Sequence, residues 1–212
     1  MTLTRFPTNI RTFIQIKKIM SPRPKNFEEN EALDAAMQVF WEKGYEATSI
    51  QDLVDRMGIN RFSIYESFGN KHELFLSACN QYKELMTEQR LQRLRTGESG
   101  MLAIRDFFSM AMKKPTRAGK AKGCLITNSI VELALHDKEA KAICGDFLVR
   151  LEDSFHEALK RAKKNKELRS KRSLRELASY LTCFAQGLGV TGKMGNDPAK
   201  TRRMIETALL QL

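Results

Sequence analysis

Arg61, Ser63 and Tyr65 are hydrogen-bond donors that lie close together in residues 49–68, which read SIQDLVDRMGINRFSIYESF. Ahead of them, apolar residues recur every three or four positions, which predicts a helix with one buried face. Gly58 then allows a tight turn into a second short helix that carries the donors. Two short helices joined by a glycine-containing turn are typical of a helix-turn-helix, a motif that binds DNA bases and phosphates.

The second predicted helix would read base edges in the major groove through its N-terminal residues. Arg61 is suited to guanine, because its guanidinium group can donate two hydrogen bonds to the O6 and N7 atoms. Phe62 could contact a thymine methyl group or pack inward, and Lys71 begins the next helix, where free N–H groups favour a phosphate. Neighbouring hydroxyl groups also suit phosphates. We therefore predict that eight residues contact DNA: Thr48, Ser49, Asn60, Arg61, Phe62, Ser63, Tyr65 and Lys71.

The longer segment 29–76 resembles the DNA-binding domain of the TetR family of transcriptional repressors. The resemblance lies in three segments, ALDAAMQVFWEKGYEATSI, IQDLVDRMGIN and SIYESFGNKHELF, which follow the order of the family pattern. Phe62 stands where the family often has glycine and Ser67 where it often has histidine, so a relative's operator sequence does not carry over. The resemblance implies a helical C-terminal domain that dimerises and binds a small-molecule effector, which releases the repressor from a palindromic operator.

Helical periodicity continues from residue 29 to the end of the chain, and no segment alternates between apolar and polar residues as a strand would. Capping patterns mark several helix starts, among them Thr48-Ser-Ile-Gln51, Asn70-Lys-His-Glu73 and Ser173-Leu-Arg-Glu176. We predict an all-α fold of about nine helices, with a three-helix helix-turn-helix domain ahead of a larger helical bundle. The predicted domains are a basic, disordered N-terminal extension or amphipathic helix over 1–27, the DNA-binding domain over 28–72, and the effector-binding and dimerisation domain over 73–212.

The 212 residues include 36 Lys and Arg against 25 Asp and Glu, a net charge of +11 that favours an anionic partner. Residues 1–71 hold only ten of the basic residues, together with nine acidic ones, so most of the excess lies farther along the chain. Nine basic residues occur in 160–175, where Glu167 is the only acid. This cluster leaves open a second hypothesis, an architectural protein that binds nucleic acid without reading its sequence.

No apolar run approaches the roughly 18 residues of a membrane span, so we expect no membrane partner. The four cysteines are widely spaced and only three histidines occur, which argues against a zinc module and favours a reducing cytoplasm. No nucleophile is accompanied by a base. We therefore expect no enzyme activity, no metal and no cofactor. The expected partners are double-stranded DNA, a small-molecule effector and a second copy that forms a homodimer.

Thr127 and Asn128 lie within an otherwise apolar helix, where buried polar groups need hydrogen-bond partners. An effector could supply those partners, although carbonyl groups one turn back or solvent could do so equally. Cys124 lies beside Lys122 at a helix start, which favours the reactive thiolate unless the residue merely packs. The other three cysteines are expected among apolar residues, where they should react less. The predicted effector contacts are Phe108, Met112, Cys124, Thr127, Asn128 and Phe147.

The last two predicted helices, over 173–193 and 197–211, offer more apolar surface than a terminal hairpin needs for itself. Such a surplus fits an isologous four-helix interface between two copies of the chain. The predicted interface residues are Leu181, Phe184, Leu188, Ile205 and Leu209.

Overall fold

The computed structural model describes residues 28–110, 122–194, 197–210 and 212, so the predicted N-terminal extension lies outside the described residues. α4 (Lys71–Met86), the π-helical turn η1 (Thr87–Leu91) and α5 (Gln92–Arg95) follow one another without a break and form one long rod. The other helices are α1 (Glu29–Lys43), α2 (Ile50–Met57), α3 (Arg61–Phe68), α6 (Gly100–Ser109), α7 (Leu125–Leu133), α8 (Lys138–Lys164), α9 (Leu174–Thr191) and α10 (Pro198–Leu209). A short 3₁₀ turn, η3 (Gly192–Met194), follows α9. With the rod counted once, the described residues form nine α-helices and no strand, which confirms the predicted all-α fold.

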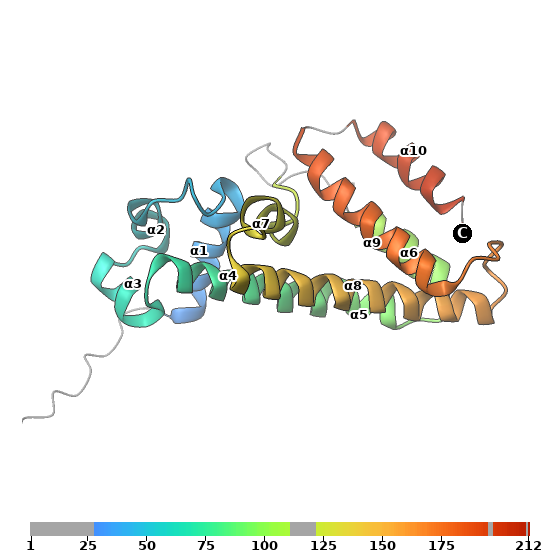
Figure 1. The fold of residues 1–212 in the computed structure, drawn as a ribbon, viewed down its shortest axis with the longest axis horizontal. Coiled ribbons are helices and arrows are strands. Elements are labelled where there is room, and N and C mark those ends of the chain that lie inside the picture. The colour runs from blue at the N-terminus through green and yellow to red at the C-terminus, as the bar shows by residue number, and fades with distance from the viewer. Residues whose placement is uncertain (1–27, 111–121, 195–196, 211) are drawn as a thin grey trace, which may run out of the picture.

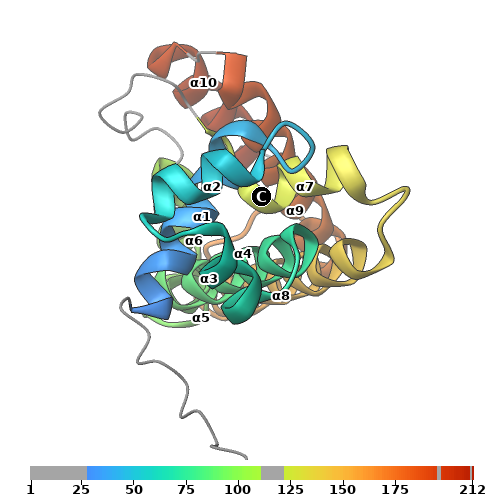
Figure 2. The same ribbon diagram turned by 90° about the vertical axis from the view of Figure 1, so that its left-hand side faces the viewer.

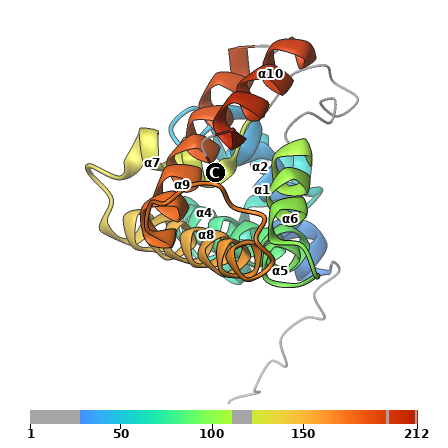
Figure 3. The ribbon, with the colours of Figure 1, turned by 90° about the vertical axis from the view of Figure 1, so that its right-hand side faces the viewer.

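The helices form two parts that are joined by the rod. α1, α2 and α3 gather at one end of the long axis, while the rod and α8 run side by side away from them (Figure 1). Figure 2, viewed from that end, places α2 and α3 in front of the bundle. Figure 3, viewed from the opposite end, shows α6 and α9 over the rod and α8, with α10 outermost. None of the described helices is long and apolar enough to span a membrane.

The start of α2 lies one residue later than the predicted capping pattern. Ser49 is the N-cap, because its hydroxyl accepts the Asp52 N–H at 3.1 Å while the Asp52 carboxylate accepts the Ser49 N–H at 2.9 Å. Thr48 is buried, and its hydroxyl donates to the Gly44 carbonyl at 2.5 Å. The other two predicted capping boxes are present at the starts of α4 and α9.

Four buried side chains, one from each of α1 to α4, hold the N-terminal helices together. Phe40, Leu53, Ile64 and Phe75 are all at most 1% exposed. The rings of Phe40 and Phe75 meet edge to face with their centroids 5.2 Å apart. Because Ile64 is fixed in this core, the opposite face of α3 is left directed toward solvent.

An aromatic cluster joins α6, α8 and α9 in the C-terminal part. The ring of Phe108 stacks on Phe155 with centroids 5.6 Å apart, and it also contacts Phe107 and Phe184. Near the C-terminal end of α8, the guanidinium of Arg161 donates hydrogen bonds to the last carbonyl groups of α5. These hydrogen bonds give partners to carbonyl groups at the C-terminal end of the rod, which would otherwise lack them, and fix the rod against α8.

Candidate DNA-binding interface

The turn between α2 and α3 has the geometry of a helix-turn-helix. α2 ends at Gly58, whose φ of 68° and ψ of 17° lie in the left-handed region that glycine adopts without strain. Asn60 then caps α3, since its side chain accepts the Ser63 N–H at 2.9 Å. Asn60 and Ser63 were both predicted to contact DNA, and both also form the start of α3. The Asn60 side chain stays exposed, whereas Ser63 is half-buried.

Three large side chains form the outward face of α3. Arg61 is exposed, the Phe62 ring is 73% exposed and Tyr65 is 44% exposed. Ile64, between them in sequence, is fully buried and anchors the helix. From sequence, Phe62 could either pack inward or face outward. In the structure it faces outward, where the ring is free to contact a thymine methyl group.

The cations nearest α3 are used inside the chain, except for Arg61. Lys43 pairs with Asp52 at 2.5 Å and lowers the pKa of that carboxyl group to about 2, and Arg56 pairs with Glu42 at 2.9 Å. Arg61 forms no ion pair with any residue that the structure describes. Its guanidinium group therefore keeps all five N–H donors for an external acceptor.

Thr48 and Lys71 are both used inside the domain. Thr48 is 1% exposed, and its hydroxyl is already donated within the chain, so the prediction that this side chain contacts a phosphate is wrong. The Lys71 ammonium group donates to the Thr48 carbonyl at 2.8 Å and lies 4.4 Å from the centroid of the Tyr45 ring. An ammonium group has three donors, so Lys71 can hold this turn and still bind a phosphate. Ser49 remains exposed beside it.

The polar residues predicted to contact an effector have partners within the chain. The Thr127 hydroxyl donates to Oε1 of Gln186 at 2.5 Å, and the Asn128 amide donates to the Lys122 carbonyl at 3.1 Å. Of the apolar residues in the predicted set, Phe108 and Phe147 are buried, and Met112 lies outside the described residues. Effector binding here would have to replace or add to these contacts, and it stays a prediction.

The four cysteines differ in accessibility. Cys79 and Cys144 are buried, and burial raises the pKa of their thiols to about 12 and about 11. Cys124 is half-buried at the N-cap of α7, where its sulfur accepts the Tyr82 hydroxyl at 3.6 Å. Cys183 is exposed on α9, unlike the buried Cys79 and Cys144.

A limiting dose of a maleimide at neutral pH is expected to label Cys124 before Cys79 and Cys144. The thiolate is the reactive form, and the raised pKa values and burial keep the Cys79 and Cys144 thiols protonated and shielded. Peptide mass spectrometry over a time course measures the order. Denaturant should expose the two slow cysteines. Early labelling of either one in the folded protein would contradict the structure.

Most of the residues predicted to form a dimer interface lie inside their own chain. Leu181, Leu188, Ile205 and Leu209 are at most 7% exposed, so the prediction that they meet a second copy is wrong. These side chains fill the space between α9, α10 and the rest of the bundle, which periodicity alone does not distinguish from an interface. Phe184 is half-buried and remains accessible.

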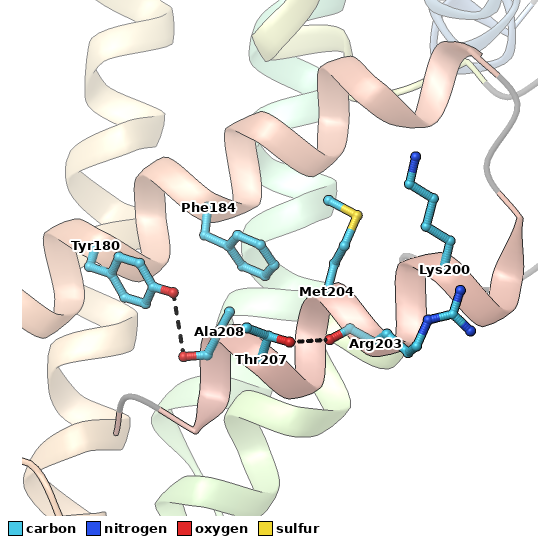
Figure 4. A pocket seen from close by; sticks show the side chains of 7 residues that line it. All are labelled: Tyr180, Phe184, Lys200, Arg203, Met204, Thr207 and Ala208. Carbon is cyan, nitrogen blue, oxygen red and sulfur yellow. Dashed lines mark hydrogen bonds between the residues drawn. The ribbon is translucent and has the colours of Figure 1, made fainter.

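A groove between α9 and α10 was not foreseen from the sequence. It has a volume of about 400 Å³, and the apolar side chains of Phe184 and Met204 face each other across it (Figure 4). Lys200 and Arg203 stand at one end of the groove. Tyr180 closes the other end and donates its hydroxyl to the Ala208 carbonyl at 3.4 Å. Apolar surface is therefore left open on the outside of these two helices.

Known protein families match both parts of this architecture. Residues 32–78 match the family model described as bacterial regulatory proteins, tetR family. Residues 100–208 match the model described as tetracyclin repressor-like, C-terminal domain. The chain belongs to the TetR family.

Relatives of this TetR-family chain share most of its length. It is 35% identical over 188 residues to the uncharacterized HTH-type transcriptional regulator YezE of Bacillus subtilis (strain 168), covering 88% of this chain and 97% of the relative. It is 27% identical over 188 residues to the HTH-type transcriptional repressor ComR of Escherichia coli (strain K12), covering 88% and 90%. A cysteine mutant of the TetR family transcriptional regulator CifR, solved with 26 bp double-strand operator DNA, is 25% identical, with a TM-score of 0.74 and coverage of 88% and 97%. The chain is therefore a helix-turn-helix transcriptional regulator by family.

Proposed function

We propose that this TetR-family regulator is a repressor that binds a palindromic operator as a homodimer and leaves it when a small-molecule effector binds. The observation that carries the proposal is the outward face of α3, where Arg61, Phe62 and Tyr65 are exposed above a buried core. A free guanidinium group suits guanine, an exposed ring suits a thymine methyl group, and a phenol suits a phosphate. The names of two relatives give support, since ComR is a repressor and CifR was solved on operator DNA.

The second copy is proposed to pack on the outer face of α9 and the turn after it. Exposed residues recur there at intervals of three and four, the spacing of a helix-pairing seam: Tyr180, Cys183, Gly187, Val190 and Met194. Tyr180, Val190 and Met194 are 38%, 47% and 87% exposed. A Cβ atom at Gly187 would meet none of the described residues within 4 Å, so the space above it is open to another helix.

This seam is nearly symmetrical about Gly187, as a two-fold interface requires. Tyr180 and Met194 each lie seven residues from Gly187, on opposite sides. Two antiparallel copies of α9 that cross at Gly187 would therefore place Tyr180 against the partner's Met194, and the reverse. A two-fold protein dimer presents two copies of α3, which a palindromic operator matches.

The effector part of the proposal rests on the position of α7. Thr127 bonds Gln186 of α9, while the indole N–H of Trp41 in α1 donates to the Gly123 carbonyl at 3.1 Å, just ahead of α7. The segment with the predicted effector residues thus contacts both the seam helix and the helix-turn-helix domain. A ligand that displaced the Thr127 contact would favour a different position of this segment and so change DNA affinity.

Selection of bound duplexes from a random pool tests the proposed function. We expect enrichment of two inverted copies of one half-site, each with a guanine for Arg61. Repeating the selection with candidate effectors should reveal one that abolishes enrichment. A pool that yields no preferred sequence, or only a single unpaired site, would reject the proposal.

The cationic segment 160–175 favours a second candidate, binding of nucleic acid without sequence preference. Lys163, Lys164 and Lys171 are exposed at the end of α8 and in the turn after it, at the opposite end of the long axis from α3 (Figure 1). Part of the cluster is used internally, since Arg175 pairs with Asp153 at 2.7 Å. A protein that acted through this segment would select no sequence and would lose affinity steeply as salt rises.

A further inference from the structure

Glu132, in the last turn of α7, holds the turn between α1 and α2. One carboxylate oxygen accepts the Tyr45 N–H at 3.1 Å, and the other accepts the Glu46 N–H at 2.8 Å. The two N–H groups belong to the helix-turn-helix domain, and the carboxylate belongs to the C-terminal part. Hydrogen bonds to an ionised acceptor are roughly twice as strong as neutral ones, so this is a firm link between the two parts.

The backbone of the turn is shaped to admit this carboxylate. Gly44 has a φ of +85°, and a Cβ atom at that position would lie only 2.8 Å from Oε2 of Glu132. A larger residue at position 44 would therefore be strained and would also push the Glu132 side chain away. Two independent features, the paired N–H donors and the glycine, thus favour the same contact.

Other contacts join the same surfaces without depending on Glu132. Lys122 pairs with Glu42 at 2.8 Å, and His72 lies 2.6 Å from a carboxylate oxygen of Asp137. These contacts lie before and after α7 in the sequence, so they would keep the two parts together if Glu132 were replaced. What would be lost is the hold on the turn that leads directly into α2.

We propose that Glu132 is a positioning residue that fixes the orientation of the helix-turn-helix domain relative to the C-terminal part. This inference rests on the homodimer of the proposed function. In that dimer, Glu132 sets the distance and angle between the two copies of α3. After one half-site is bound, the second binds at an effective concentration that depends on this geometry. A loosely held domain must also be ordered at that step, which costs affinity.

Glu132→Gln tests this role, because the amide nitrogen of glutamine is a donor and cannot accept the second N–H. We expect affinity for a duplex with one half-site to stay within about twofold, because α2 and α3 are untouched. Affinity for the inverted repeat should fall about tenfold, the loss expected when one charge-assisted hydrogen bond no longer orients the domain. Selection with the variant should also accept a wider range of spacings between half-sites.

Two further variants and the wild type serve as controls for the Glu132→Gln experiment. Glu88→Gln removes an exposed carboxylate that has no partner among the described residues, and it should change none of these measurements. Gly44→Ala should repeat the loss on the inverted repeat by pushing Glu132 away. Equal losses on the single half-site and on the inverted repeat, or no loss on either, would overturn the positioning role. The wild-type selection decides the proposed function separately, and the ratio of variant to wild type decides this inference.

Discussion

Replacing Arg61 with alanine is expected to cost about 1–3 kcal/mol of operator-binding free energy and to relax base preference at one position of each half-site. The guanidinium group has no ion pair with any described residue, so its loss removes an external contact and not an internal one. Binding isotherms on the selected duplex measure the affinity, and a second selection with the variant identifies the relaxed position. An unchanged site and an unchanged affinity would show that α3 is not the reading helix.

Lys71→Ala is the contrasting variant for this experiment. Lys71 is placed to neutralise a phosphate, so its loss should weaken binding to all sequences alike and reduce the salt slope by about one unit. The variant also removes the hydrogen bond to the Thr48 carbonyl, so its thermal midpoint must be measured alongside. Loss of base preference in Lys71→Ala, with none in Arg61→Ala, would reverse the roles assigned to the two residues.

Val190→Glu is expected to turn the homodimer into a monomer and to lower affinity for the inverted repeat at least about hundredfold, because the second half-site contact is lost. Val190 lies on the exposed seam of α9, and an isologous interface would bury two of the new carboxylates among apolar groups. Light scattering at micromolar concentration measures the mass, and binding to single and paired half-sites measures the consequence. The variant should bind a single half-site as well as the wild type does.

Val149→Glu provides the matched control for this change. Val149 is 61% exposed on α8, outside the seam, so the same substitution there should leave a dimer. A dimeric Val190→Glu protein would place the interface elsewhere. A wild-type protein that is monomeric at micromolar concentration, yet binds the inverted repeat with full affinity, would contradict the dimer itself.

The order and bounds of the helices could be predicted because their signals are local. Periodicity and caps such as Asn70 and Ser173 depend only on residues within one turn. The dimer residues could not be predicted in this way, because α9 has apolar residues on two faces. Leu181 faces its own bundle and Val190 faces outward, and the packing of α6, α7 and α8 against α9 determines which face is covered.

Contacts between segments far apart in the chain could also not be predicted from the sequence. Glu132 looks like a solvent-exposed helix residue, and its partners at Tyr45 and Glu46 lie more than 80 positions away. Thr48 was assigned to DNA because a hydroxyl at a helix start can bind a phosphate, but the Gly44 carbonyl takes its proton. The exposure of Phe62 could not be predicted from sequence, because it depends on how α3 packs against its neighbours.

Sequence-specific recognition by α3 is tested most directly by the affinities for the selected duplex and for a scrambled duplex, measured over a series of salt concentrations. Both affinities should fall as salt rises, because phosphate contacts release counterions. Specific recognition predicts that the selected duplex stays preferred by about a thousandfold or more at physiological salt. Equal affinities that fall along the same steep slope would contradict it and would instead favour binding without sequence preference, the second candidate.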